Sequence, residues 1–353
     1  MIQSLRRLLA MSAALLACGA VPVAAQSLQS VREPARPLTL KARGSLFVGG
    51  EPAEATQADL GLGPADRVTV NQMYVEYMVP TGRPKLPVVM IHGAGLSGKS
   101  YDTTPDGRMG WFEYFVRKSH PTYVIDQVGR ARSGFNHIPL NRRLAGEMPE
   151  VKGPAAFRFG ERSGVWTNFR FGPREGEPFP DAQFPTQAAA ELAKQAIPDL
   201  TSLVPSPNPT FKALSSLAKD LKGAILISHS QSGPFPMDAA LIDPAGIRGI
   251  VSVEPGTCRS TYTDEQIARL ARVPTLILFG DHLSAATGLG GTWQVRFDGC
   301  RTYAARIKAA GRTIDLVQTS DLGIHGNSHM LMQDRNSDQI ADIILTWIDA
   351  HVA

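Results

Sequence analysis

Cysteine is scarce in this chain of 353 residues, which contains only Cys18, Cys258 and Cys300. No CxxC or HExxH motif occurs, and cysteines and histidines do not cluster at the spacing of zinc ligands. We therefore expect neither a structural nor a catalytic metal site.

Tracts of basic residues are also missing. Lysines and arginines are scattered and are not interleaved with aromatic residues, so nucleic acid is not an expected partner. Beyond the N-terminal region, no stretch is long and apolar enough to predict a transmembrane helix. No internal repeat is evident, and the sequence gives no indication of oligomeric state.

The first 25 residues have the organisation of a secretory signal peptide. A charged start precedes an apolar run at 8–17, which is too short to span a membrane, and small residues follow up to Ala25. Cys18 is an alternative processing site, for lipid attachment, but the leucine two residues before it fits that role poorly. We favour cleavage after Ala25 and expect a periplasmic or secreted protein with one domain at 26–353.

An oxidising compartment favours a disulfide between the two cysteines that remain after cleavage, Cys258 and Cys300. Such a bridge would close a loop of about 43 residues and stabilise the fold by roughly 4 kcal/mol in the chain-entropy model. The alternative is a pair of buried free thiols.

Apolar runs recur along the chain with room for a helix between them. Continuous apolar character is typical of parallel strands that are covered on both faces. The runs occupy 87–92, 122–126, 224–228, 250–253, 275–279 and 314–318. Alternation at 38–48 and 68–78 predicts an antiparallel pair at one edge, and apolar spacing at 337–350 predicts a final helix. We therefore predict an α/β fold with a mostly parallel sheet flanked by helices.

The interval 134–222 is too long for a simple crossover between strands. It is rich in proline, glycine and phenylalanine and contains a helical pattern near 187–196. We interpret it as a lid insertion over the carboxyl ends of the strands, where ligands bind in open α/β sheets.

The most informative segment is Ile225–Gly233, in which an apolar strand leads directly into Ser230. The small residues Ser228 and Ser232 lie two positions on either side of it, as in a nucleophile elbow. This turn is so tight that only small neighbours fit, and it exposes the serine hydroxyl at the end of the strand. A serine-rich turn without catalytic function is the plain alternative.

The segment Gly93–Ser100 matches both the phosphate-loop and the dinucleotide-binding patterns. Both require a helix to begin at once, but 101–107 consists of turn formers and helix breakers, so we reject phosphate binding. A His-Gly pair beginning at His92 is instead typical of an oxyanion hole, with the amides of Ala94 and Gln231 as donors. His92 itself is expected to support the loop.

A serine nucleophile needs a histidine base and an acid that orients it, in the chain order Ser, acid, His. His329 lies between the last strand and the last helix, the expected position; His325 is its rival, and His282 comes too early. Glu254 ends one strand and Asp281 follows the next. We favour Glu254, because Asp281 directly follows a glycine, whereas an acid at that location usually lies a few residues further on.

Together with the turn Asp126–Ser133, these motifs resemble the α/β-hydrolase superfamily. The segments 103–111, 252–256 and 325–330 more narrowly resemble a small group of exported bacterial serine esterases, and the resemblance extends from about residue 88 to the C-terminus. It implies a glutamate as the acid of the triad and paired cysteines near the two positions named above. The chain departs from this group at Ala94-Gly95, where the known member has two adjacent cysteines.

We therefore expect an exported serine hydrolase that cleaves small carboxylic esters through an acyl-enzyme intermediate and needs no cofactor. Lactones, thioesters or amides are alternative substrates. A non-catalytic binding module is the alternative from another class, although a complete Ser-Glu-His set argues against it. Aromatic residues of the insertion either bind an apolar substrate group or pack the lid onto the body, and we favour packing. They are Phe157, Phe159, Trp166, Phe169, Phe171, Phe179 and Phe184.

Overall fold

The structure is a computed structural model that describes residues 31–147, 156–200, 203–312 and 314–352. The predicted signal peptide, with its alternative processing sites at Cys18 and Ala25, lies outside the described residues. Among the described helices, none has the length and apolar character needed to cross a membrane.

An eight-stranded sheet runs through the molecule in the order β1-β2-β4-β3-β5-β6-β7-β8. The strands are β1 (Leu40–Ala55), β2 (Asp66–Pro80), β3 (Val88–Ile91), β4 (Thr122–Asp126), β5 (Ala224–His229), β6 (Ile247–Val253), β7 (Thr275–Phe279) and β8 (Asp315–Gln318). β2 pairs antiparallel with β1 and β4, and all other pairings are parallel. The predicted mostly parallel sheet with an antiparallel edge is confirmed.

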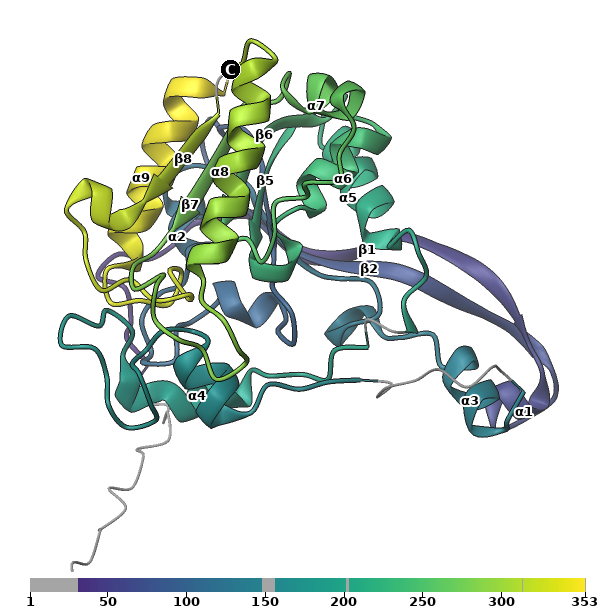
Figure 1. The fold of residues 1–353 in the computed structure, drawn as a ribbon. Coiled ribbons are helices and arrows are strands. Elements are labelled where there is room, and N and C mark those ends of the chain that lie inside the picture. The colour runs from purple at the N-terminus through teal and green to yellow at the C-terminus, as the bar shows by residue number, and fades with distance from the viewer. Residues whose placement is uncertain (1–30, 148–155, 201–202, 313, 353) are drawn as a thin grey trace, which may run out of the picture.

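Helices cover both faces of the sheet (Figure 1). On one face lie α2 (Trp111–Arg117) and α9 (Ser337–His351); on the other lie α5 (Pro209–Asp220), α6 (Phe235–Ile242), α7 (Asp264–Leu270) and α8 (Gln294–Ala309). Within β3, Val89 and Ile91 join one apolar core while Val88 and Met90 join the other. Both faces of this strand are buried, which explains why its sequence is apolar throughout.

β1 and β2 continue past the sheet as a two-stranded arm that reaches away from the body, with α1 (Gln57–Leu60) and α3 (Ile138–Leu144) at its tip (Figure 1). Arg142 binds both carboxylate oxygens of Asp59 there, at 2.8 and 2.7 Å. The sequence predicted only the proximal part of this pair. The distal half of β1 continues as Gly49-Gly50-Glu51-Pro52, so the alternation of apolar and polar residues that predicts a strand is missing from its sequence.

The predicted insertion has parts with different surroundings. A π-helical turn (Glu161–Thr167) and α4 (Ala189–Lys194) lie beyond the carboxyl ends of the central strands (Figure 1), and α4 is shorter than the predicted helix at 187–196. α5, in contrast, packs against α6 and places Leu214 and Leu217 in the main core. The segment outside the layers of the body therefore ends before Pro209, not at residue 222.

Candidate active site

Ser230 occupies a strained turn directly after β5. Its φ of 58° lies in the left-handed region, which a residue with a side chain rarely adopts. Gly93 lies so close that an added Cβ would stand 2.9 Å from the Cβ of Ser230, and a Cβ on Gly233 would collide with Pro255. The turn therefore requires glycine at both neighbouring positions.

The serines that flank Ser230 brace this turn through buried hydroxyl groups. Ser232 Oγ accepts a hydrogen bond from the amide of His229 at 3.1 Å and lies 3.0 Å from the carbonyl oxygen of Ile91 on β3. Ser228 Oγ donates to the carbonyl oxygen of Gly233 at 3.2 Å. These bonds explain how serine takes the place that glycine often has in such a turn.

A hydrogen-bonded chain connects Ser230 with His329 and Glu254. His329 Nε2 lies 2.9 Å from Ser230 Oγ, and His329 Nδ1 lies 2.9 Å from Glu254 Oε2. Because a carboxylate can only accept, the Nδ1 proton of the imidazole points to Glu254 and the Nε2 lone pair faces the serine hydroxyl. This is the arrangement that a serine nucleophile and its base require.

Glu254 is held at the end of β6 with a φ of 51°. Its Oε1 accepts hydrogen bonds from the amide of Gly280 and from Arg170 Nη2, the latter at 2.7 Å. Burial alone would raise the pKa of this carboxyl group, but the charge of Arg170 and the bond to His329 outweigh burial and lower the pKa to about 2. Glu254 is therefore ionised at neutral pH.

His329 is enclosed by rings and has no net charge at neutral pH. Its ring centroid lies 4.2 Å from that of Trp293, 4.6 Å from that of His229 and 5.1 Å from that of Phe169. Burial lowers the pKa of His329 below its usual 6.5, and the charge of Arg170 lowers it further, although Glu254 acts in the opposite direction. The imidazole is therefore available as a base.

The rival residues from the sequence form a separate cluster. Asp281 accepts hydrogen bonds from the amides of His282 and Gly326, at 2.8 and 3.2 Å, and its Oδ2 lies 3.3 Å from Nδ1 of the exposed His325. Ligand atoms of Asp181, Asp281 and His282 lie within 4.8 Å of one another and could hold a metal ion. His282 Nε2 is, however, already 2.8 Å from Asp181 Oδ1, and no hydrogen bond among the described residues joins a side chain of this cluster directly to Ser230 or His329.

Arg170 is a residue of the site that sequence reasoning missed. Its side chain is fully buried, its φ is 59°, and its Nε donates to the carbonyl oxygen of Asp281 at 2.7 Å. Its guanidinium also lies over the ring of Trp293, 5.3 Å from the centroid. A single arginine within a long insertion carries no local sequence signal, since its partner is 84 residues away.

The loop after β3 is pinned by His92, as predicted. His92 Nε2 accepts from the amide of Gln127 at 3.0 Å, so Nδ1 carries the proton and donates to the carbonyl oxygen of Gly93 at 2.8 Å. Burial lowers the pKa of His92 to about 4, which keeps it neutral. Gly95 donates its amide to Asp199 at 3.1 Å, whereas the partly exposed Ala94 makes no backbone hydrogen bond within the described residues.

The turn at Asp126 shapes this region and does not reach Ser230. Asp126 accepts from the amides of Gly98 and Arg132, at 2.7 and 3.1 Å, and its carbonyl oxygen accepts from Ser133 Oγ at 2.6 Å. The phosphate-loop pattern therefore leads into a single 3-10 turn (Gly98–Tyr101) whose first amide is already bonded to a carboxylate. This geometry agrees with the rejection of phosphate binding.

A cavity of about 440 Å³ opens beside Ser230. The segment between β7 and α8 forms much of its wall, including Leu289 and Trp293, while α8 contributes Arg296 and the insertion contributes Asn168. None of the seven insertion aromatics borders this cavity. Most are buried against one another, for example Phe171 and Phe184, whose stacked rings are 3.8 Å apart, so the packing interpretation is the better one.

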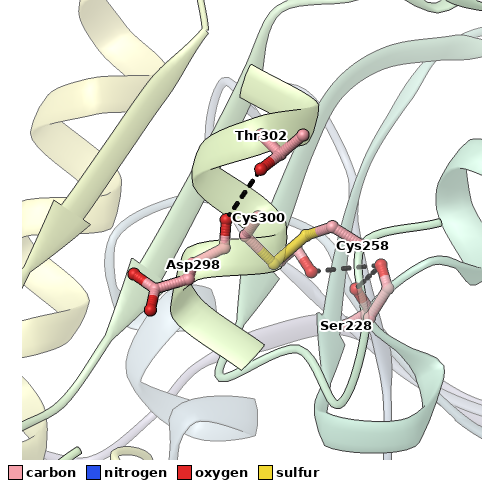
Figure 2. The surroundings of a disulfide bond; sticks show 7 residues. Ser228, Cys258, Asp298, Cys300 and Thr302 are labelled. Atoms are coloured by element: carbon pink, nitrogen blue, oxygen red, sulfur yellow. Dashed lines mark hydrogen bonds between the residues drawn. A yellow bond between two sulfur atoms is a disulfide. The ribbon is translucent and has the colours of Figure 1, made fainter. Parts of the chain in front are cut away.

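Cys258 and Cys300 form a disulfide bond, as predicted. Figure 2 shows that this bond joins α8 to the loop that follows β6. Thr302 Oγ1 donates to the carbonyl oxygen of Asp298 within the same stretch of α8, at 3.1 Å. The bond thus connects two elements whose neighbouring residues, Thr257 and Arg296, both border the cavity.

Comparison with known proteins agrees with this architecture, although no family model matches the chain. A solved structure described as a novel bacterial esterase is 45% identical, with a TM-score of 0.83; the alignment covers 91% of this chain and 99% of that chain. A probable secreted lipase, phiG, from a fungal species (strain ATCC 74256) is 24% identical, covering 78% of this chain and 85% of the relative. The chain belongs to the α/β-hydrolase superfamily, within a group of bacterial esterases, and is a carboxylic ester hydrolase.

Proposed function

We propose that Ser230, His329 and Glu254 are the catalytic triad of an exported esterase that works through an acyl-enzyme intermediate. The observation that carries the proposal is the continuous chain of two 2.9 Å contacts from the serine oxygen through the imidazole to the carboxylate. Asp281 and His325 contact each other and have no comparable link to the serine.

Each residue has a defined task in this mechanism. Ser230 Oγ attacks the ester carbonyl carbon while His329 Nε2 takes the hydroxyl proton. Glu254 keeps the imidazole in the required tautomer and stabilises its positive charge. Collapse of the tetrahedral intermediate expels the alcohol, which receives the proton from His329. The serine is then acylated and the base is neutral again.

Deacylation repeats these steps with water. His329 takes a proton from a water molecule, whose oxygen attacks the acyl carbon, and then returns the proton to Ser230 as the carboxylic acid leaves. The amides of Ala94 and Gln231 would stabilise the negative oxygen in both steps. His92 and Asp199 bind Gly93 and Gly95, on either side of Ala94, and so hold the loop after β3 in place. The amide of Ala94 therefore need not reorganise during the reaction.

Export to the periplasm or the medium is part of the proposal. The disulfide between Cys258 and Cys300 supports it, because such bonds persist in oxidising compartments. The similar fungal protein is described as secreted, which is consistent. Fractionation of cells that produce the full chain, with mass spectrometry of the mature N-terminus, would separate cleavage after Ala25 from lipid attachment at Cys18.

The triad is tested by labelling with a fluorophosphonate probe and mapping the adduct by mass spectrometry. We expect an adduct on Ser230 in the wild type and none in Ser230→Ala. Glu254→Gln should lower the labelling rate and the esterase kcat/KM by about 10³-fold or more, because the imidazole loses its orienting charge. The matched variant Asp281→Asn should change both by less than about tenfold.

An adduct on a different residue, or Asp281→Asn with the larger loss, would contradict the assignment. Thermal melting of each variant distinguishes a catalytic loss from an unfolded protein.

A further inference from the structure

We infer that the cavity beside Ser230 selects esters that carry an anionic group, with Arg296 as the residue that binds it. This inference rests on the proposed catalytic role of Ser230, because the same cavity would hold the substrate.

The charge of the cavity is one-sided. Arg296 borders it, and no aspartate or glutamate among the described residues does so. The remaining polar side chains of the wall are neutral, such as those of Asn168, Thr257 and Thr292. A substrate carboxylate would thus meet a cation with no competing anion beside it.

Arg296 also lacks a partner of its own. It is exposed, and within the described chain its side chain has no ion pair and no hydrogen bond. Other arginines of α8 are paired: Arg301 lies 2.9 Å from Asp298, and Arg306 lies 2.8 Å from Asp264. The guanidinium donors of Arg296, which suit the planar geometry of a carboxylate, are therefore available to a ligand.

The place of Arg296 in α8 adds to this local positive field. The residue lies in the first turn of a helix of 16 residues that has no acidic side chain in that turn. A cation is disfavoured at a helix start, where the backbone already presents partial positive charge. An anion entering the cavity would relieve this repulsion between the helix and Arg296.

The rest of the cavity limits the substrate further. Trp293 and Leu289 supply apolar surface, and Trp293 also contacts the imidazole of His329. A volume of about 440 Å³ suits a small ligand. The substrate class is therefore a small ester with a short apolar part between the scissile bond and an anionic group, in either its acyl or its alcohol portion.

Two matched pairs of substrates test this inference. In the first, the para-nitrophenyl monoester of glutaric acid is compared with para-nitrophenyl pentanoate, so that the acyl chain ends in a carboxylate or a methyl group. In the second, the acetate ester of para-hydroxyphenylpropanoate is compared with para-propylphenyl acetate, which places the charge in the alcohol portion. The measured quantity is kcat/KM for the anionic ester divided by kcat/KM for its neutral match.

We expect Arg296→Gln to lower this ratio by about tenfold or more for at least one pair, the loss typical of one charge-assisted hydrogen bond. Arg296→Lys should retain part of the preference. The matched control Arg301→Gln removes the same charge from the same helix outside the cavity wall and should leave the ratios unchanged. High salt should reduce the wild-type ratio.

Two results would overturn the inferred preference for anionic esters and leave the proposed function intact. One is ratios within about twofold of wild type in Arg296→Gln; the other is an equal loss in Arg301→Gln, which would indicate only long-range attraction. In both cases the wild type still hydrolyses the neutral esters and is labelled at Ser230. A wild type that hydrolyses none of the four esters and takes no label would overturn the proposed function as well.

Discussion

The proposed nucleophile Ser230 and two other residues of the site, Glu254 and Arg170, have left-handed backbone conformations, with φ values of 58°, 51° and 59°. Each such conformation costs a residue with a side chain roughly 1 kcal/mol or more. Such a strained backbone conformation persists only where surrounding hydrogen bonds hold it. At Ser230 they do so, because its carbonyl oxygen accepts hydrogen bonds from the amides of both Gly233 and Gly256. The backbone of the site is therefore preorganised before any substrate binds.

Arg170 should act through Glu254 and His329 as a positioning residue. Its charge lowers the pKa of both groups, so Arg170→Met should shift the acid limb of the kcat/KM profile to higher pH and lower kcat about tenfold or more. Arg170→Lys, which keeps the charge, should show a smaller shift. An unchanged acid limb in a folded Arg170→Met variant would contradict this role.

At the scale of elements, the site is assembled from the ends of β5 and β6, the start of α8 and the loop before α9. The disulfide connects two of these parts, the loop after β6 and the second turn of α8. The loop before α9 is held by Asp334, which accepts hydrogen bonds from the amide and hydroxyl of Ser328 and from Asn327. The segments that carry Glu254 and His329 are thus each held in place by contacts outside the triad.

Removal of the disulfide should destabilise the protein and loosen the cavity wall. The two cysteines are 42 positions apart, and in the chain-entropy model the double variant Cys258→Ala, Cys300→Ala loses about 4 kcal/mol of unfolding free energy. Urea unfolding of this variant and of the oxidised wild type measures the difference. A loss below about 1 kcal/mol would mean that the bridge contributes little to stability.

At the scale of the whole molecule, buried titratable groups couple stability to pH. Burial lowers the pKa of His92 to about 4 and that of His229 to about 3, and His329 is also lowered. Burial raises the pKa of Asp334 to about 6, which acts in the opposite sense, while interactions lower the pKa of Glu254 to about 2. Burial also lowers the pKa of His120 and raises that of Asp338, so four neutral histidines oppose two carboxyl groups between neutral and mildly acidic pH.

We therefore expect the free energy of unfolding to decrease as the pH falls from about 6.5 toward 4. In this range the unfolded chain protonates its histidines while the folded protein keeps them neutral, and each unit of pKa difference corresponds to about 1.4 kcal/mol per group. Protonation of Asp334 offsets part of the decrease below its pKa. Urea unfolding at a series of pH values measures the trend, and stability that rises on acidification would contradict it.

Much of this protein could be predicted from local patterns. Apolar runs located the strands within a few residues because both faces of the central sheet are buried. The elbow at Ser230 was evident because a tight turn restricts its neighbours to small residues. Glu254 was a candidate because it directly follows a strand, and His329 because it lies between the last strand and the last helix. These features depend on residues that are close in the sequence.

The remaining features depend on which distant segments meet, and no local pattern encodes that. The folded chain places Arg170 against Glu254, separates Asp281 from His329, and brings the start of α8, with Arg296, to the cavity beside Ser230. It also extends β1 and β2 into an arm, although the distal half of β1 has no apolar alternation in its sequence. A contact between residues far apart in sequence arises from the packing of whole elements, so it becomes visible only in the assembled fold.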